Sequence, residues 1–124
     1  MTDDEARDRI DAYCDCWRVM EPAERVARLR ALLDAGVRYV DPRTDVTGIP
    51  ALAEHVERVA AARPDARIVR TSEVDRHHDV ARFEWALEDG SERHLSGSVD
   101  VVRFGGDGAI ATIIGFFGAA RPVG

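Results

Sequence analysis

The spacing of apolar residues changes at about residue 66 of this 124-residue chain, and that change limits the folds open to it. Before this point apolar residues recur every three or four positions, which is typical of amphipathic helices. After it, apolar and polar residues alternate, which predicts half-buried strands. Helical segments followed by a run of strands indicate an α+β fold, in which helices cover one face of a sheet.

Two helices are predicted to form a short hairpin at the start of the chain. Thr2 and Glu5 have the spacing of a capping box and begin the first helix. Pro22 takes a first-turn position of the second helix, where its missing N–H costs nothing. Gly36 is predicted to end that helix in a left-handed conformation.

A short strand and a third helix follow. The strand Val37–Asp41 is ended by Pro42, which lacks the N–H that a ladder needs. Residues 43–48 are predicted to be a loop that leads into the third helix, which ends at Pro64. His55 lies within the arc of that helix's apolar stripe and is expected to face inward or to lie at its border. The stripe consists of Ile49, Leu52, Val56 and Val59.

Four strands are predicted to complete a single domain over residues 1–124. Their approximate ranges are Arg67–Arg76, Val80–Glu88, Arg93–Phe104 and Ala109–Gly118. Asp89-Gly90 predicts a tight hairpin, while residues 77–79 and 105–108 supply the other turns. The result is a curved, mostly antiparallel sheet with the helices on one face.

Charge and composition exclude several classes of function. The net charge is -6, and all 17 basic residues are arginines. These arginines are not concentrated in any segment as a basic stripe, so nucleic-acid binding is not expected. The acidic N-terminus carries no apolar leader, and no run approaches the roughly 18 apolar residues of a membrane span. We therefore expect a cytoplasmic protein without membrane association.

The cysteines and histidines do not suggest a redox or metal site. Cys14 and Cys16 lie two apart on a helix and point to opposite sides, which rules out an unstrained disulfide and places one of them near the surface. His77 and His78 are adjacent in a turn and are expected to point apart, with no spaced ligands elsewhere. No metal and no cofactor is predicted.

Two aspartates stand on strand faces that are otherwise apolar. Asp100 shares its face with Val102 and Phe104, and Asp41 shares one with Tyr39. An unpaired buried carboxylate costs several kcal/mol, so both positions need an explanation. In one reading both acids enter a single cavity, where one acts as a base and the other as a neutral donor. In the other, Asp41 caps the loop after it and Asp100 pairs with an arginine across the sheet.

The chain resembles the NTF2-like superfamily, and within it the SnoaL-like proteins and the ketosteroid-isomerase group. The resemblance covers about residues 6–119. It rests on the order of elements and on these segments: Val37-Arg-Tyr-Val-Asp41-Pro42, Gly48 opening a helix, Gly97-Ser-Val-Asp100-Val-Val-Arg-Phe104 with Asp107-Gly108, and Gly115-Phe-Phe-Gly118. It implies a cone-shaped roll that encloses a pocket.

The same resemblance implies roles for individual residues. Asp41 falls where the isomerase group keeps its proton-shuttling base, and Asp100 falls where that group keeps a protonated donor. The helix-one tyrosine of that group is replaced here by Trp17, with Tyr13 a turn earlier, so steroid isomerisation itself is not implied. His55 is placed to poise Asp41 or to act as a base, unless it is only a partly buried histidine bound to water.

The predicted function is to bind a hydrophobic cyclic small molecule, with cofactor-independent isomerase, cyclase or dehydratase chemistry carried by Asp41, Asp100 and His55. The alternative is a non-catalytic ligand-binding or association module. The expected substrate contacts are Tyr13, Trp17, Tyr39, Val56, Phe83, Trp85, Val102, Phe104, Ile113 and Phe117. A homodimer through the exposed sheet face is implied as well, with Arg82, Glu84 and Arg103 pairing across a two-fold axis.

Overall fold

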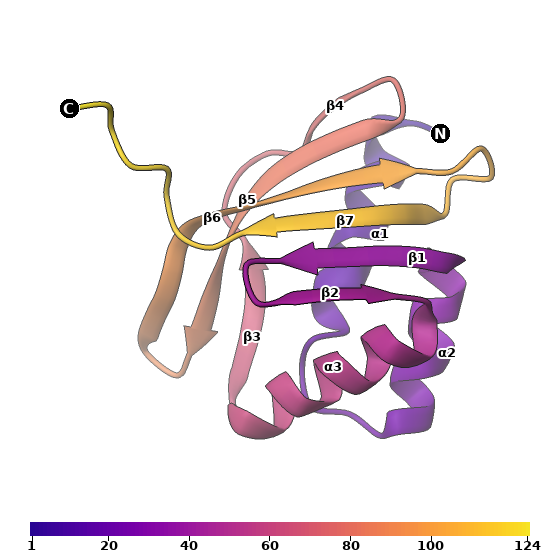
Figure 1. Ribbon diagram of the computed structural model, residues 1–124, viewed down its shortest axis with the longest axis horizontal. Helices are drawn as coiled ribbons and strands as arrows, with labels where there is room; N and C mark the ends of the chain where they lie inside the picture. The colour runs from indigo at the N-terminus through magenta and orange to yellow at the C-terminus, as the bar shows by residue number, and fades with distance from the viewer.

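The computed structural model describes all 124 residues as three helices against a curved, unclosed sheet of seven strands (Figure 1). The elements are α1 (Asp3–Asp15), α2 (Pro22–Leu32), β1 (Leu33–Asp41), β2 (Thr44–Thr47), α3 (Ile49–Ala62), β3 (Ala66–Arg70), β4 (Asp75–His77), β5 (Val80–Asp89), β6 (Glu92–Phe104) and β7 (Ile110–Phe116). The strand order is β2-β1-β7-β6-β5-β3, and β4 also pairs with β5. Because β1 runs parallel to β7 while the other pairs are antiparallel, the sheet is mixed. The predicted α+β class is confirmed.

The helices begin where the sequence predicts. The Thr2 side chain accepts the Glu5 N–H while the Glu5 carboxylate accepts the Thr2 N–H, so the capping box is formed in both directions. Pro22 opens α2. Gly48 precedes α3 at a φ of +90°, a conformation in which a β-carbon would be strained.

The predicted left-handed end of α2 at Gly36 is wrong. The chain passes directly from α2 into β1 at Leu33, whose backbone is already extended and whose side chain is buried in the core. Gly36 instead lies inside β1, where its N–H donates to the Asp34 carboxylate. The pairing of β1 with β7 is irregular between Leu33 and Arg38, and this irregularity accommodates the local turn of the backbone.

Residues 43–48, predicted as a loop, contain the short edge strand β2. It pairs antiparallel with β1 from Arg38 opposite Thr47 to Asp41 opposite Thr44. The Arg38 guanidinium and the Asp45 carboxylate, 2.9 Å apart, form an exposed ion pair across this hairpin. A strand of four residues with alternating half-buried positions is too short to give a strong periodic signal.

The segment Arg67–Arg76, predicted as one strand, is divided into β3 and β4. Both pair with β5, but the residues between them leave the ladder. The Ser72 hydroxyl accepts the Glu84 N–H, and the Thr71 N–H donates to the Glu84 carbonyl, so β5 keeps its hydrogen bonds across the break. Satisfied donors and acceptors make the interruption tolerable.

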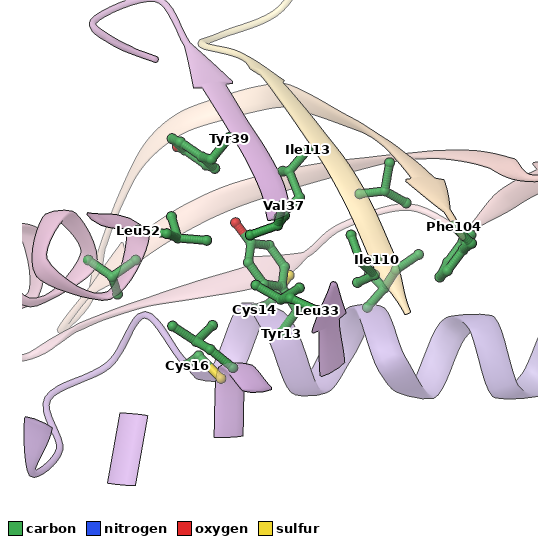
Figure 2. Close-up of a cluster of buried hydrophobic side chains, with 14 of the residues drawn as sticks. Tyr13, Cys14, Cys16, Leu33, Val37, Tyr39, Leu52, Phe104, Ile110 and Ile113 are labelled. Atoms are coloured by element: carbon green, nitrogen blue, oxygen red, sulfur yellow. The ribbon is translucent and has the colours of Figure 1, made fainter. Parts of the chain in front are cut away.

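The helices pack on the concave face of the sheet and enclose one hydrophobic core, part of which is drawn in Figure 2. The predicted alternation is confirmed on β5, where Phe83 and Trp85 are buried, and on β6, where Val102 and Phe104 are buried. Cys14 and Cys16 are free and both buried, so the expectation that one lies near the surface is wrong. No helix is long and apolar enough to span a membrane.

Candidate functional site

A cavity of about 520 Å³ opens at one end of the concave face. Its wall is formed by residues from α1, α3 and five strands together with the segments next to them. The lining residues are Tyr13, Cys14, Trp17, Tyr39, Asp41, Arg43, Thr44, His55, Val59, Arg63, Ile68, Trp85, Leu87, His94, Leu95, Asp100 and Phe117. A volume of this size suits a small organic molecule.

The structure brings together most of the residues that the sequence singled out. Those on the cavity wall are Tyr13, Trp17, Tyr39, Asp41, His55, Trp85, Asp100 and Phe117. The other predicted substrate contacts do not line the cavity, because they lie deeper in the core and are almost fully enclosed by protein. These core residues are Val56, Phe83, Val102, Phe104 and Ile113.

Asp100 is a buried carboxyl group on β6. It is 9% exposed, and the Trp85 indole N–H donates to its Oδ1 at 2.9 Å. Burial raises the pKa of Asp100 to about 7, against the Trp85 hydrogen bond, and the charge of Asp41 raises it further. No arginine forms an ion pair with Asp100, so the predicted cross-sheet pairing is absent. Because indole nitrogen can only donate, Oδ2 is the oxygen left to carry a proton.

Asp41, at the end of β1, accepts hydrogen bonds at both carboxylate oxygens. Its Oδ1 accepts the Arg43 N–H at 2.8 Å, which is the turn-capping contact of the second reading of the sequence. Its Oδ2 accepts the Tyr39 hydroxyl at 2.5 Å, and His55 Nε2 lies 4.0 Å from the same atom. Both readings therefore hold for Asp41, since it caps a turn and also lines the cavity.

Gly115 separates the two aspartates on the sheet. Asp100 pairs directly with Gly115, and β1 lies on the other side of β7. A β-carbon at residue 115 would lie 3.0 Å from Asp100 Oδ1 and 3.6 Å from the Asp41 β-carbon. The missing side chain thus leaves space between Asp100 Oδ1 and the Asp41 side chain across β7.

Three rings line the wall next to Asp41. Trp17 and Tyr39 have ring centroids 5.6 Å apart, and His55 lies 5.8 Å from the first and 5.6 Å from the second. Burial lowers the pKa of His55, although the nearby Asp41 charge works in the opposite direction. Burial, together with the hydrogen bond to Asp41, raises the pKa of the Tyr39 phenol. Both shifts favour the neutral form of the ring.

The Tyr13 hydroxyl is a buried polar group without a hydrogen-bond partner. Its side chain is 1% exposed, and its ring reaches from α1 toward the sheet (Figure 2). Burial raises the pKa of this phenol, so the proton is firmly held. Because Tyr13 also belongs to the cavity lining, this unsatisfied hydroxyl needs an explanation, and donation to a ligand is one.

Several lining residues carried no signal in the sequence. His94 and Leu95 reach the cavity because the β5–β6 hairpin bends strongly (Figure 1). The bend follows an irregularity between Trp85 and Leu87 and a positive φ of 56° at Leu95. Apolar periodicity does not encode such a bend. Arg43, by contrast, follows Asp41 closely enough for its position to have indicated the site.

His77 and His78 do not point apart as expected. Their Nδ1 atoms lie 3.0 Å from each other because His78 has a positive φ of 51°, which turns its ring toward its neighbour. Both residues are exposed, and neither lines the cavity. No group of three or more His, Cys, Asp or Glu side chains is arranged to hold a metal ion.

No protein-family model matches the sequence, and no curated protein matches it. Solved structures do resemble the fold. A SnoaL-like family protein from Agrobacterium tumefaciens, named as an isomerase, is 26% identical, with a TM-score of 0.83 over 94% of this chain and 98% of that one. The chain has the NTF2-like fold and is similar to the SnoaL-like family.

Two more distant structures share the NTF2-like fold of this chain. An NTF2-like protein of unknown function from Exiguobacterium is 22% identical, with a TM-score of 0.67 over 86% of this chain and 95% of that one. A protein with a ketosteroid isomerase-like fold from Catenulispora acidiphila, solved with trimethylamine, is 17% identical, with a TM-score of 0.71 over 89% and 85%. At these identities the likeness concerns the fold alone.

Proposed function

We propose that this SnoaL-like chain is a cofactor-independent proton-transfer enzyme that acts on a hydrophobic cyclic small molecule, as an isomerase, cyclase or dehydratase. The observation that carries the proposal is the pair of aspartates facing one cavity in different environments. Asp41 accepts two hydrogen bonds, whereas Asp100 is buried with a pKa of about 7. Such a difference lets one carboxyl act as base while the other donates a hydrogen bond.

Asp41 removes the proton in this proposal. The Tyr39 hydroxyl and the Arg43 N–H fix the orientation of its carboxylate, and Asp41 belongs to the cavity lining. His55, 4.0 Å from Oδ2, is held beside it by the contacts with Trp17 and Tyr39. Holding a base in place reduces the reorganisation that proton transfer otherwise requires.

Asp100 and Tyr13 stabilise the negative charge that develops on the substrate oxygen. Protonated Asp100 has one oxygen occupied by the Trp85 N–H and the other free to donate. The Tyr13 hydroxyl has no other partner in the protein. Two donors in a dry cavity stabilise an oxyanion far more than they would in water. Trp17 and His55 orient the ring system.

The test uses proton exchange, which needs no knowledge of the natural substrate. Exchange of the α-protons of 2-tetralone into deuterated water at pH 6 is followed by NMR. We expect the wild-type protein to accelerate exchange, and Asp41→Asn to reduce the rate about 10³-fold or more, with a loss of about 10²-fold for Asp100→Asn. Asp65→Asn is the matched control, because Asp65 is exposed and lies outside the cavity lining.

Binding separates this proposal from the alternative of a non-catalytic module. Affinity for 2-tetralone should change by less than about threefold in Asp41→Asn, since the variant keeps the shape of the wall. A wild-type protein that binds 2-tetralone and yet leaves its exchange rate unchanged would favour the binding module.

We further propose a homodimer through the convex face of the sheet. Ile114 and Phe116 of β7 are exposed there beside Val99 and Val101 of β6. This apolar strip, rather than the predicted arginine and glutamate pairs, is the feature that supports association. Arg82 already pairs with Asp75 of its own chain at 2.9 Å.

Sedimentation velocity tests the dimer. Phe116→Glu should convert it to monomer, because a charge in the strip would be buried on association. Val19→Glu is the control, since Val19 is similarly exposed but lies between α1 and α2. A wild-type monomer at micromolar concentration would contradict the proposal.

A further inference from the structure

The charged groups of the cavity lining differ in depth, since the acids are buried and the guanidinium groups are exposed. The buried end holds the carboxyl groups of Asp41 and Asp100, whose side chains are almost inaccessible. The mouth holds Arg43 and Arg63, which are exposed and also belong to the lining. Most of the wall between these ends is aromatic or aliphatic. A molecule that fills the cavity therefore meets acids at its inner end and guanidinium groups at its outer end.

Of the two arginines in the cavity lining, Arg43 is the one whose guanidinium has no partner in the protein. Most of the 17 arginines form an ion pair, and Arg63 is among them, with Nη1 3.3 Å from Asp89 Oδ2. The Arg43 side chain forms neither an ion pair nor a hydrogen bond. Only its backbone N–H is used, as the donor to Asp41 Oδ1. Its side chain is thus available to a ligand at the mouth, while its backbone holds the proposed base.

We propose that the ligand of this site is a ring compound with a carboxylate, whose rings fill the cavity and whose carboxylate binds Arg43 at the mouth. This inference rests on the proton-transfer function proposed above and adds the charge and orientation of the substrate. A guanidinium matches a carboxylate with two parallel N–H donors. Binding in the reverse orientation would bring the carboxylate against Asp41 and is disfavoured by like-charge repulsion.

The net charge of the protein also bears on which anionic group the ligand carries. At a net charge of -6 the molecule as a whole repels anions, so an anionic ligand needs a local positive group at its binding site. One free guanidinium suits a singly charged carboxylate better than a doubly charged phosphate, since Arg63 is shared with Asp89.

Three naphthalene compounds test the inference: 2-naphthoate, its neutral methyl ester and 2-naphthyl phosphate. None of them has an α-proton to exchange, so the experiment measures binding alone. Dissociation constants are obtained from quenching of Trp17 and Trp85 fluorescence, since both indoles line the cavity. We expect the wild-type protein to bind 2-naphthoate about tenfold more tightly than the ester. Arg43→Ala should abolish this preference and leave the affinity for the ester unchanged.

Arg30→Ala is the matched control, because Arg30 is exposed and free of ion pairs but lies on α2, outside the cavity lining. It should keep the tenfold preference. The inference would be overturned if the wild-type protein bound 2-naphthoate and its ester equally, or if the preference for 2-naphthoate survived Arg43→Ala. Proton transfer is tested separately by the exchange of 2-tetralone. Tighter binding of the phosphate would overturn the carboxylate assignment. Failure of all three compounds to bind would contradict the ligand class itself.

Discussion

The concave face of the sheet has two ends that differ in kind, although the same three strands build both. Along β1, Val37 lies in the packed core and Asp41 lies at the cavity. Along β6, Phe104 lies in the core and Asp100 at the cavity. The third strand, β7, begins at the fully buried Ile110 and passes between the two aspartates at a residue without a side chain.

One continuous face of the sheet therefore forms both a packed core and a polar cavity. At the packed end the side chains interlock and contribute most of the stability, as the close cluster of Val37, Ile110 and Phe104 in Figure 2 illustrates. At the open end the sheet carries groups that cost stability, namely a buried carboxyl and an unsatisfied hydroxyl. We expect removal of the buried charge at the open end to stabilise the fold, and loss of a core side chain at the packed end to cost more stability than a matched loss at the open end.

The largest effect is expected from Asp100→Asn at the open end. The native pKa of about 7 lies above the ordinary value of 3.8, so between these pH values the folded state holds a proton that the unfolded state has lost. The free energy of unfolding of the wild-type protein therefore falls as pH rises from about 4 to 7, and the full cost of roughly 4 kcal/mol applies above pH 7. The variant, which has no charge to bury, should be more stable at pH 8 by up to that amount.

Chemical denaturation of both proteins between pH 4.5 and 8 measures this effect. The difference in unfolding free energy should shrink toward pH 4.5, while other titrating groups cancel between the two proteins. If the variant were less stable than the wild type at pH 8, Asp100 would stabilise the fold. That result would contradict the expectation that the buried carboxyl at the open end costs stability.

At the packed end, Ile110→Ala should be destabilising by about 3 kcal/mol, because Ile110 is fully buried and its loss leaves a cavity. Leu95→Ala is the matched change at the open end. Leu95 is 41% exposed and lines the cavity, so the cost should be below about 1 kcal/mol. Urea denaturation compares the two, and similar losses for both variants would argue that the ends do not differ.

Gly115→Ala tests the space between the aspartates. A methyl group there meets Asp100 Oδ1 at 3.0 Å, so we expect a loss of about 1–2 kcal/mol and a marked fall in the rate of 2-tetralone exchange. Gly106→Ala is the control, because nothing lies within 4 Å of a β-carbon at that turn position. Unchanged exchange in Gly115→Ala would mean that the separation of the two carboxyl groups does not matter.

The smallest effect is expected for Phe117→Ala. Phe117 is 37% exposed and contacts the Trp85 ring edge-on at a centroid distance of 6.1 Å, which stabilises the fold by about 1 kcal/mol or less. Affinity for 2-naphthoate should fall severalfold. Phe116→Ala, on the convex face, should instead weaken the proposed dimer and leave this affinity unchanged. If Phe116→Ala lowered the affinity for 2-naphthoate and Phe117→Ala did not, the ligand would bind on the convex face of the sheet and not in the cavity.

Much of the fold could be predicted because periodicity and capping are local properties of the sequence. The capping box of Thr2 and Glu5, and the alternation that buries Phe83 and Trp85, follow from such patterns. The end of α2 could not, because Leu33 leaves the helix to fill the core and Gly36 is accommodated within a strand. The strand β2 is too short to be recognised before its partner is known.

The candidate site could be predicted only as far as strand faces reveal it. Asp41 and Asp100 stood out because each breaks an apolar row. Phe104 and Ile113 lie on the same faces, yet they pack in the core, since periodicity does not tell where along a strand the cavity begins. Leu95 reaches the wall only because the hairpin bends. Such curvature depends on tertiary contacts.

The central claim is that the two aspartates hold different charge states in one cavity, and carbon-13 NMR of the aspartate side-chain carboxyl groups measures this directly. We expect Asp100 to titrate with a midpoint of about 7, well above the exposed carboxyl groups, and Asp41→Asn to lower this midpoint by removing a neighbouring charge. A midpoint near 4, unchanged in Asp41→Asn, would show that Asp100 is not held protonated by burial and by the Asp41 charge.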